Sequence, residues 1–95
     1  MAKGYIVADI HVHDKEGFEK FRQIASPVIG EYGGKILVRN PKPEVREGID
    51  VGMVILLEFE SMENARKFYE SEKYTSAIAL REKAADTNLY LVEGA

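Results

Sequence analysis

Residues 51–59, with the sequence VGMVILLEF, predict a strand that is apolar on both faces along most of its length. Val54 and Leu56 alternate with Ile55 and Leu57, so neither face of this strand offers a polar surface to water. Strands that are covered by protein on both faces are typical of the centre of a sheet. We therefore expect this strand to be central, with protein packed on both sides of it.

The remaining segments alternate between strand and helix patterns. In chain order they are a strand at residues 4–12, a helix from Asp14 to Tyr32, a strand at 35–39, helices that begin at Ser61 and Ser71, and a final strand at 88–93. This βαββαβ order, with its second helical region divided in two, predicts a ferredoxin-like α+β fold. We expect residues 1–95 to form a single domain, an antiparallel sheet of order 4-1-3-2 with helices on one face.

The face of the sheet without helices is predicted to be apolar as well. Val54 and Leu56 belong to it in the central strand, and Tyr90 and Val92 belong to it in the last strand. A sheet covered by one helix layer normally has a polar second face. The simplest cover for an apolar one is a second copy of the chain, related by a two-fold axis. The pattern therefore predicts a homodimer that forms through the sheet face.

Composition excludes several classes of partner. Hydrophobic residues make up 45% of the chain and charged residues 31%, with a net charge of -3 and no cysteine. Acidic and basic residues are interspersed, so we expect no binding to nucleic acid or to anionic membranes. The N-terminal sequence MAKGYIVADI lacks the apolar core of a signal peptide, and no segment is long and apolar enough to span a bilayer. These features favour a cytoplasmic location.

Three segments and one capping residue resemble a known family. They are YGGKILVR, LLEFESMENARKFYES, EKYTSAIALREKAADTNLYLVEG, and the acidic residue Asp14 at the start of the first helix. Together they resemble the domain of unknown function thirteen-thirty family, within the dimeric α+β barrel superfamily. The resemblance implies a homodimer of ferredoxin-like subunits whose sheets form a barrel. It implies no activity, because the wider superfamily includes cofactor-free monooxygenases, haem-degrading enzymes, muconolactone isomerase-like proteins and stress-related barrels.

Arg81 is the strongest candidate for a functional side chain. It lies three residues after Ile78, on the helix stripe that is expected to face the sheet. A guanidinium in that position needs a carboxylate or an anionic ligand. One alternative is a structural ion pair, whose candidate partners are Glu58, Glu47 and Asp9. The other is that Arg81 anchors the carboxylate or enolate of a substrate.

Arg39 and several aromatic residues are further candidates for ligand binding. Two glycines turn the chain back before the second strand, and Arg39 ends that strand at the rim of the expected pocket. Tyr5 and Tyr69, with Phe68 and Tyr74, are candidates to line a cavity between the helices and the sheet. Aromatic residues at helical spacing are more often part of a core than of a binding site.

His11 and Asp9 are candidates for proton transfer. His11, His13 and Asp9 are spaced by two residues and are expected to project from one face of the first strand. Histidine titrates near neutral pH, so His11 suits a general base, with Asp9 as its alternative. Two histidines without a clear third ligand do not make a metal site, and we expect none.

The sequence contains no glycine-rich phosphate loop, nucleophile motif or nucleotide fingerprint, so we expect no bound cofactor. Three hypotheses follow. The protein is a cofactor-independent enzyme that acts on a small, partly apolar oxygenated compound, a non-catalytic binder of such a compound, or a structural or stress-associated homodimer. Whether it is an enzyme stays open at this stage.

Overall fold

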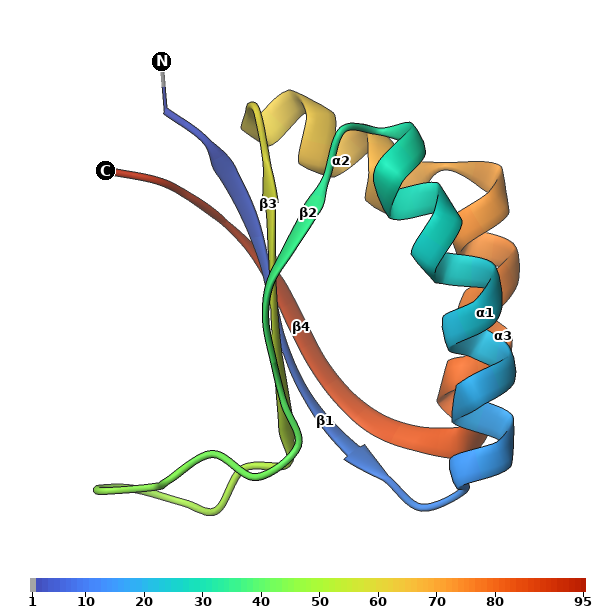
Figure 1. The fold of residues 1–95 in the computed structure, drawn as a ribbon, viewed down its shortest axis with the longest axis vertical. Helices are drawn as coiled ribbons and strands as arrows, with labels where there is room; N and C mark the ends of the chain where they lie inside the picture. Colours follow the sequence, from blue (N-terminus) through green and yellow to red (C-terminus); the bar gives the residue numbers. More distant parts are fainter. Residues whose placement is uncertain (1) are drawn as a thin grey trace.

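A computed structural model describes the protein over residues 2–95. The strands are β1 (Gly4–Val12), β2 (Lys35–Asn40), β3 (Met53–Phe59) and β4 (Ala85–Glu93), and the helices are α1 (Lys15–Glu31), α2 (Met62–Glu70) and α3 (Glu72–Ala84). All three helices lie against the same side of the sheet (Figure 1). We call this side the helix-covered face and the other side the helix-free face.

The sheet is antiparallel and has the order β2-β3-β1-β4. This is the predicted order 4-1-3-2, read from the other edge, and β3 and β1 are central as expected. The predicted ferredoxin-like α+β fold is therefore confirmed. β4 begins at Ala85, three residues earlier than expected, because Ala85 and Asp86 pair with Val12 and His11 at the end of β1.

Side-chain caps fix where the helices begin. Asp14, Ser61 and Ser71 precede α1, α2 and α3, and each accepts a hydrogen bond from the backbone N–H three residues later, at 3.1, 3.1 and 3.2 Å. These bonds satisfy one of the free donors at each helix N-terminus. The three predicted helix starts are therefore confirmed.

Two glycines end α1 and start β2. Gly33 has φ of 75°, a left-handed conformation that only glycine adopts readily. The backbone N–H of Gly34 donates to the carbonyl of Ile29 at 2.9 Å. A Cβ atom at Gly34 would lie 2.6 Å from the ring of Phe59, so a side chain there is excluded. The two glycines therefore reverse the chain direction between α1 and β2, as the sequence predicts.

A β-bulge in β2 changes which side chains face the helices. Ile36 is paired with Leu57 and Val38 is paired with the adjacent Leu56, so Leu37 is an extra residue between them. A bulge of this kind shifts the alternation of the strand by one residue. The side chains beyond the bulge therefore lie on the opposite face from the one that regular alternation predicts.

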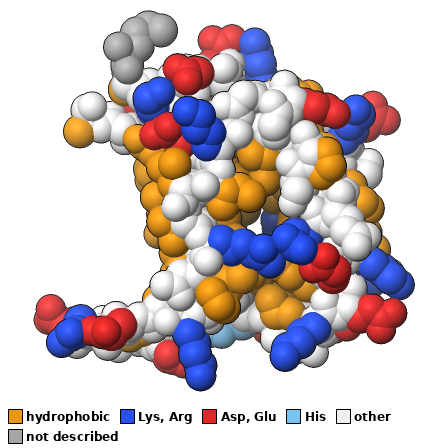
Figure 2. All heavy atoms as spheres, viewed as in Figure 1, with side chains coloured by type: hydrophobic (Ala, Val, Ile, Leu, Met, Phe, Trp, Pro, Cys, Tyr) orange, Lys and Arg blue, Asp and Glu red, His pale blue; other side chains and the backbone are white. Residues whose placement is uncertain are grey.

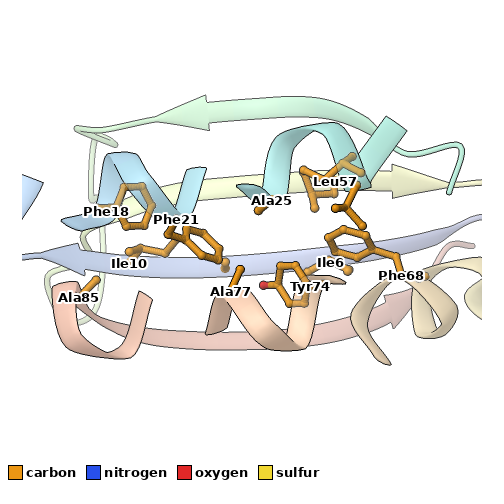
Figure 3. Packing of buried hydrophobic residues seen from close by; sticks show 14 of the residues in the cluster. Ile6, Ile10, Phe18, Phe21, Ala25, Leu57, Phe68, Tyr74, Ala77 and Ala85 are labelled. Atoms are coloured by element: carbon orange, nitrogen blue, oxygen red, sulfur yellow. The ribbon is translucent and has the colours of Figure 1, made fainter. Parts of the chain in front are cut away.

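The hydrophobic core lies between the helices and the helix-covered face (Figure 3). Phe59, Phe68 and Ile6 are its largest fully buried side chains. Aromatic rings contact one another along the core, and the centroids of Phe68 and Tyr74 are 4.6 Å apart. Figure 3 shows that Phe21 from α1 and Tyr74 from α3 approach each other over β1. The core therefore joins all three helices to the sheet.

Apolar side chains of β3 and β4 lie on the helix-free face. Tyr90 is 54% exposed and Val92 is 39% exposed, while Val54 and Leu56 are partly buried. The connection between β2 and β3 projects from this side of the sheet (Figure 1), and it carries Ile49, which is 84% exposed. Within residues 2–95, no helix combines the length and the apolar character needed to cross a membrane.

Candidate functional site

A cavity of about 90 Å³ lies between α1 and the helix-covered face, and we call it the inner cavity. Its walls are mostly apolar side chains, among them Ile6, Ile55, Phe21, Ala25 and Ile29. Figure 2 shows a hollow with hydrophobic walls in this region, with lysine or arginine side chains lying across it. The site therefore combines an apolar interior with basic groups.

Arg81 places a buried guanidinium in the lining of the inner cavity. Its side chain comes from α3, and the residue is only 6% exposed. Nη1 donates a hydrogen bond to the hydroxyl of Tyr74 at 2.6 Å, seven residues earlier on the same helix. The guanidinium carbon lies 5.5 Å from the ring centroid of Phe21 and 6.0 Å from that of Tyr74. These rings partly stabilise the cation.

No carboxylate of residues 2–95 forms a salt bridge with Arg81, whose Nε also lacks a hydrogen-bond acceptor among these residues. Glu58 accepts a hydrogen bond from Tyr5 at 3.1 Å, and Asp9 accepts one from a backbone N–H before β3 at 2.7 Å. Glu47 is exposed in the connection between β2 and β3. The predicted structural ion pair of Arg81 with one of these three carboxylates is therefore wrong.

Tyr74 is the titratable group in direct contact with Arg81. Burial raises the pKa of Tyr74 above that of a free tyrosine, although the positive charge of Arg81 acts in the opposite direction. Tyr74 is therefore neutral at physiological pH. Its oxygen accepts the bond from Arg81, which leaves its own hydrogen for donation to a ligand.

Tyr74 is expected to ionise above pH 10. Its pKa is higher in the folded chain than in the unfolded one, so its contribution to stability is complete below pH ~10 and is lost as the pH rises above that value. The measurement is the absorbance of tyrosinate against pH, for wild type and Tyr74→Phe. The difference between the two curves should titrate above pH ~10. A difference that titrates below that pH would contradict the assignment.

Arg39 and an ion pair on α1 stand at the mouth of the inner cavity. Nε and Nη2 of Arg22 donate to the two carboxylate oxygens of Glu19 at 2.9 and 2.8 Å. These bonds are the main reason why the pKa of Glu19 is lowered, and the charge of Arg39 also contributes. Glu19 is therefore neutralised by Arg22, and Arg39 has no salt bridge of its own in the described part of the chain.

A wider groove of about 470 Å³ adjoins the inner cavity, and we call it the outer groove. Ile10, Phe18 and Arg39 line both spaces, so Arg39 stands where they meet. Lys15 and Glu19 also line the outer groove, and the end of β1 borders it at His11, whose side chain is directed to the helix-free face. The charged side chains are thus concentrated at the mouth and in the outer groove, except for Arg81, which is buried in the interior.

The structure brings together some of the predicted site residues and separates others. Arg81 and Arg39 line the inner cavity, whereas Tyr69 does not line it and contacts Tyr74 instead, with ring centroids 5.5 Å apart. Tyr5 was expected in this cavity but lies on the helix-free face, where alternation along β1 also places Asp9 and His11. His11 Nε2 lies 3.6 Å from Asp9 Oδ1. These two candidates for proton transfer are therefore on the opposite side of the sheet from Arg81.

Sequence reasoning missed the ion pair at the mouth and the outer groove. The available signal for the ion pair was the spacing of three residues between Glu19 and Arg22, which places both on one side of α1. His13 lies beyond the end of β1, so it does not share a strand face with His11. Within residues 2–95, the acidic and histidine side chains form no group of three or more that is arranged to hold a metal ion.

Comparisons with known proteins identify the fold and one family. The model of a family described as Domain of unknown function (DUF1330) matches residues 3–95. No curated protein matches the chain in sequence. Among solved structures, a protein of unknown function from Rhodopseudomonas palustris has a TM-score of 0.78 and 16% identity, with 96% of this chain and 81% of that one covered.

Two further solved structures have the same fold at lower similarity. SnoaB, a cofactor-independent oxygenase from Streptomyces nogalater, has a TM-score of 0.67 and 11% identity over 97% of this chain and 92% of that one. A dimeric protein of unknown function and ferredoxin-like fold from Bacteroides fragilis has a TM-score of 0.59 and 8% identity over 96% and 93% of the two chains. At these identities the likeness concerns the fold alone.

Proposed function

Because the chain belongs to the DUF1330 family, a domain of unknown function, we propose its function from the geometry of the inner cavity. The protein binds a small, partly apolar oxygenated compound as its anion, without a tightly held cofactor. Arg81 binds the carboxylate or enolate, and the apolar walls bind the hydrocarbon part of the ligand. The observation that carries the proposal is the buried guanidinium of Arg81, which forms no salt bridge with any carboxylate of residues 2–95.

The energetics of burial support a ligand at Arg81. A buried charge is costly unless it is paired and hydrogen-bonded. Arg81 obtains one neutral acceptor and two aromatic rings from the chain, which compensate only part of that cost. An anionic ligand supplies the missing acceptor for Nε, and charge-assisted bonds of this kind are about twice as strong as neutral ones. A purely structural role for Arg81 lacks the paired carboxylate that it requires.

Tyr74 is proposed to assist Arg81 in binding the ligand. Its hydroxyl is neutral at physiological pH and has a hydrogen to donate. Tyr74 lines the inner cavity together with Arg81, so both donors border the same space. A carboxylate has two oxygens and accepts from both at once. The pair therefore suits a carboxylate or an enolate with a neighbouring oxygen better than it suits a lone hydroxyl group.

Small carboxylic acids are expected to raise the melting temperature of the wild-type protein, and their amides are not. At a ligand concentration one hundred times the Kd the stabilisation is about 2.7 kcal/mol, which is ~10 °C or more in a domain of this size. The measurement is a thermal melt with aromatic and aliphatic acids, each paired with the amide of the same skeleton. Equal shifts from acids and amides, or no shift from any acid, would contradict anion binding.

A cofactor-independent oxygenase is the second candidate function. SnoaB, which has the same fold, is described as a cofactor-independent oxygenase. In such a reaction Arg81 would stabilise the anion of the substrate, which fits its buried position beside an apolar cavity. Uptake of dioxygen by protein free of metal, in the presence of an enolisable or phenolic ligand, distinguishes this enzyme from a non-catalytic binder.

We also propose that the protein is a homodimer through the helix-free face. The apolar side chains of that face, Tyr90 and Val92 among them, are exposed in the single chain. The Bacteroides fragilis protein with the same fold is described as dimeric. A two-fold axis through the face would cover the apolar surface of both copies. The inner cavity lies on the other side of the sheet, so dimerisation would leave it accessible.

A further inference from the structure

The inner cavity alone is too small for a ligand of more than a few heavy atoms. Its volume is about 90 Å³, which is smaller than the engineered apolar cavity of ~150 Å³ that binds benzene. The outer groove adds about 470 Å³ and joins the inner cavity beside Ile10, Phe18 and Arg39. A ligand that places its anion at Arg81 and has a larger body therefore extends past Arg39.

The outer groove contains positively charged side chains that can bind a negative group of such a ligand. Arg39 and Lys15 line it, and within residues 2–95 neither forms a salt bridge. Glu19, the one carboxylate among the described lining residues, is already bound by two hydrogen bonds from Arg22. The groove therefore complements a negative group rather than a positive one.

The β-bulge at Leu37 is what brings Arg39 to this position. Beyond the bulge Arg39 is paired with Ile55, which lines the inner cavity. Regular alternation from Ile36 would place Val38 on the helix-covered face and Arg39 on the helix-free face. Bulges commonly re-aim a side chain next to a functional site. Because of the bulge, Arg39 rather than the apolar Val38 lies on the helix-covered face, where the inner cavity and the outer groove meet.

We propose that Arg39 is a second anion-binding residue and that the ligand is an elongated dianion with an apolar middle. One acidic group binds at Arg81, the hydrocarbon segment lies along the inner cavity, and the second acidic group binds at Arg39 in the outer groove. Straight-chain dicarboxylates are the simplest members of this class. This assignment rests on the proposed function, since it takes the anion at Arg81 as its starting point.

The test is calorimetric titration of the full chain with dicarboxylates from succinate to sebacate and with monocarboxylates of the same length. We expect the best dicarboxylate to bind wild type about tenfold more tightly than its monocarboxylate. Arg39→Ala should remove this advantage, so that the dicarboxylate and the monocarboxylate bind the variant with affinities equal within about twofold. The matched control is Arg66→Ala, which removes an exposed arginine on α2 that lines neither space and should preserve the advantage.

The possible outcomes separate this inference from the proposed function. Equal affinities for mono- and dicarboxylates in wild type would overturn the second site and leave anion binding at Arg81 intact. A dicarboxylate advantage that persists in Arg39→Ala would overturn the assignment to Arg39. Failure of both ligand series to bind would overturn the proposed function, and the second site with it.

Discussion

Leu56→Asp is expected to convert the proposed homodimer into a monomeric or aggregating protein. Leu56 lies on β3, one of the two central strands, and its side chain belongs to the helix-free face. A two-fold axis brings both copies of a substituted residue into the interface, so one change introduces two carboxylates there. An unpaired polar group costs about 4 kcal/mol to bury and a charge costs more. A penalty of that size weakens association at least ~1000-fold.

The measurement is light scattering coupled to size exclusion, over a range of micromolar concentrations. Wild type should have the mass of two chains throughout that range. Ile24→Asp is the matched control, because Ile24 is 45% exposed on α1 and lies away from the helix-free face. It should retain the dimer. A folded wild-type monomer, or a Leu56→Asp dimer as stable as wild type, would exclude this interface.

The strands and helix starts were predictable because each has a local cause. β1 alternates between buried side chains such as Ile6 and partly exposed ones such as Tyr5, so its pattern has the period of a half-buried strand. β3 is apolar on both faces. One face packs against the helices, and the other is available for a partner to cover. The beginning of β4 has no such pattern, since Asp86 and Thr87 are polar. Pairing with β1, a tertiary interaction, extends the strand there.

The candidate site was predictable only in part. The stripe of α3 that faces the sheet indicated that Arg81 is buried, and it is. Its partner was not predictable, because the bond to Tyr74 depends on side-chain directions that spacing alone does not fix. The position of Arg39 depends on an extra residue in β2, and the sequence of that strand contains no glycine or proline to indicate a bulge.

Arg81→Met is expected to leave the unliganded protein as stable as wild type or to stabilise it by about 1–3 kcal/mol. The substitution removes a buried charge that no carboxylate of residues 2–95 balances and replaces it with an apolar side chain of similar length. The loss of the bond to Tyr74 costs about 1 kcal/mol in return. Had Arg81 been paired with a buried carboxylate, the same substitution would have cost ~3–5 kcal/mol.

The same variant is expected to bind carboxylic acids about 100-fold more weakly than wild type, because it lacks the charge that holds the ligand anion. Denaturant melts of both proteins, with and without the acids that stabilise wild type, measure the two effects together. Arg66→Met is the control, since that arginine is exposed and its replacement should change stability by less than ~0.5 kcal/mol. A large loss of stability in Arg81→Met would assign the guanidinium a structural role. An unchanged response to the acids would place the anion elsewhere in the molecule.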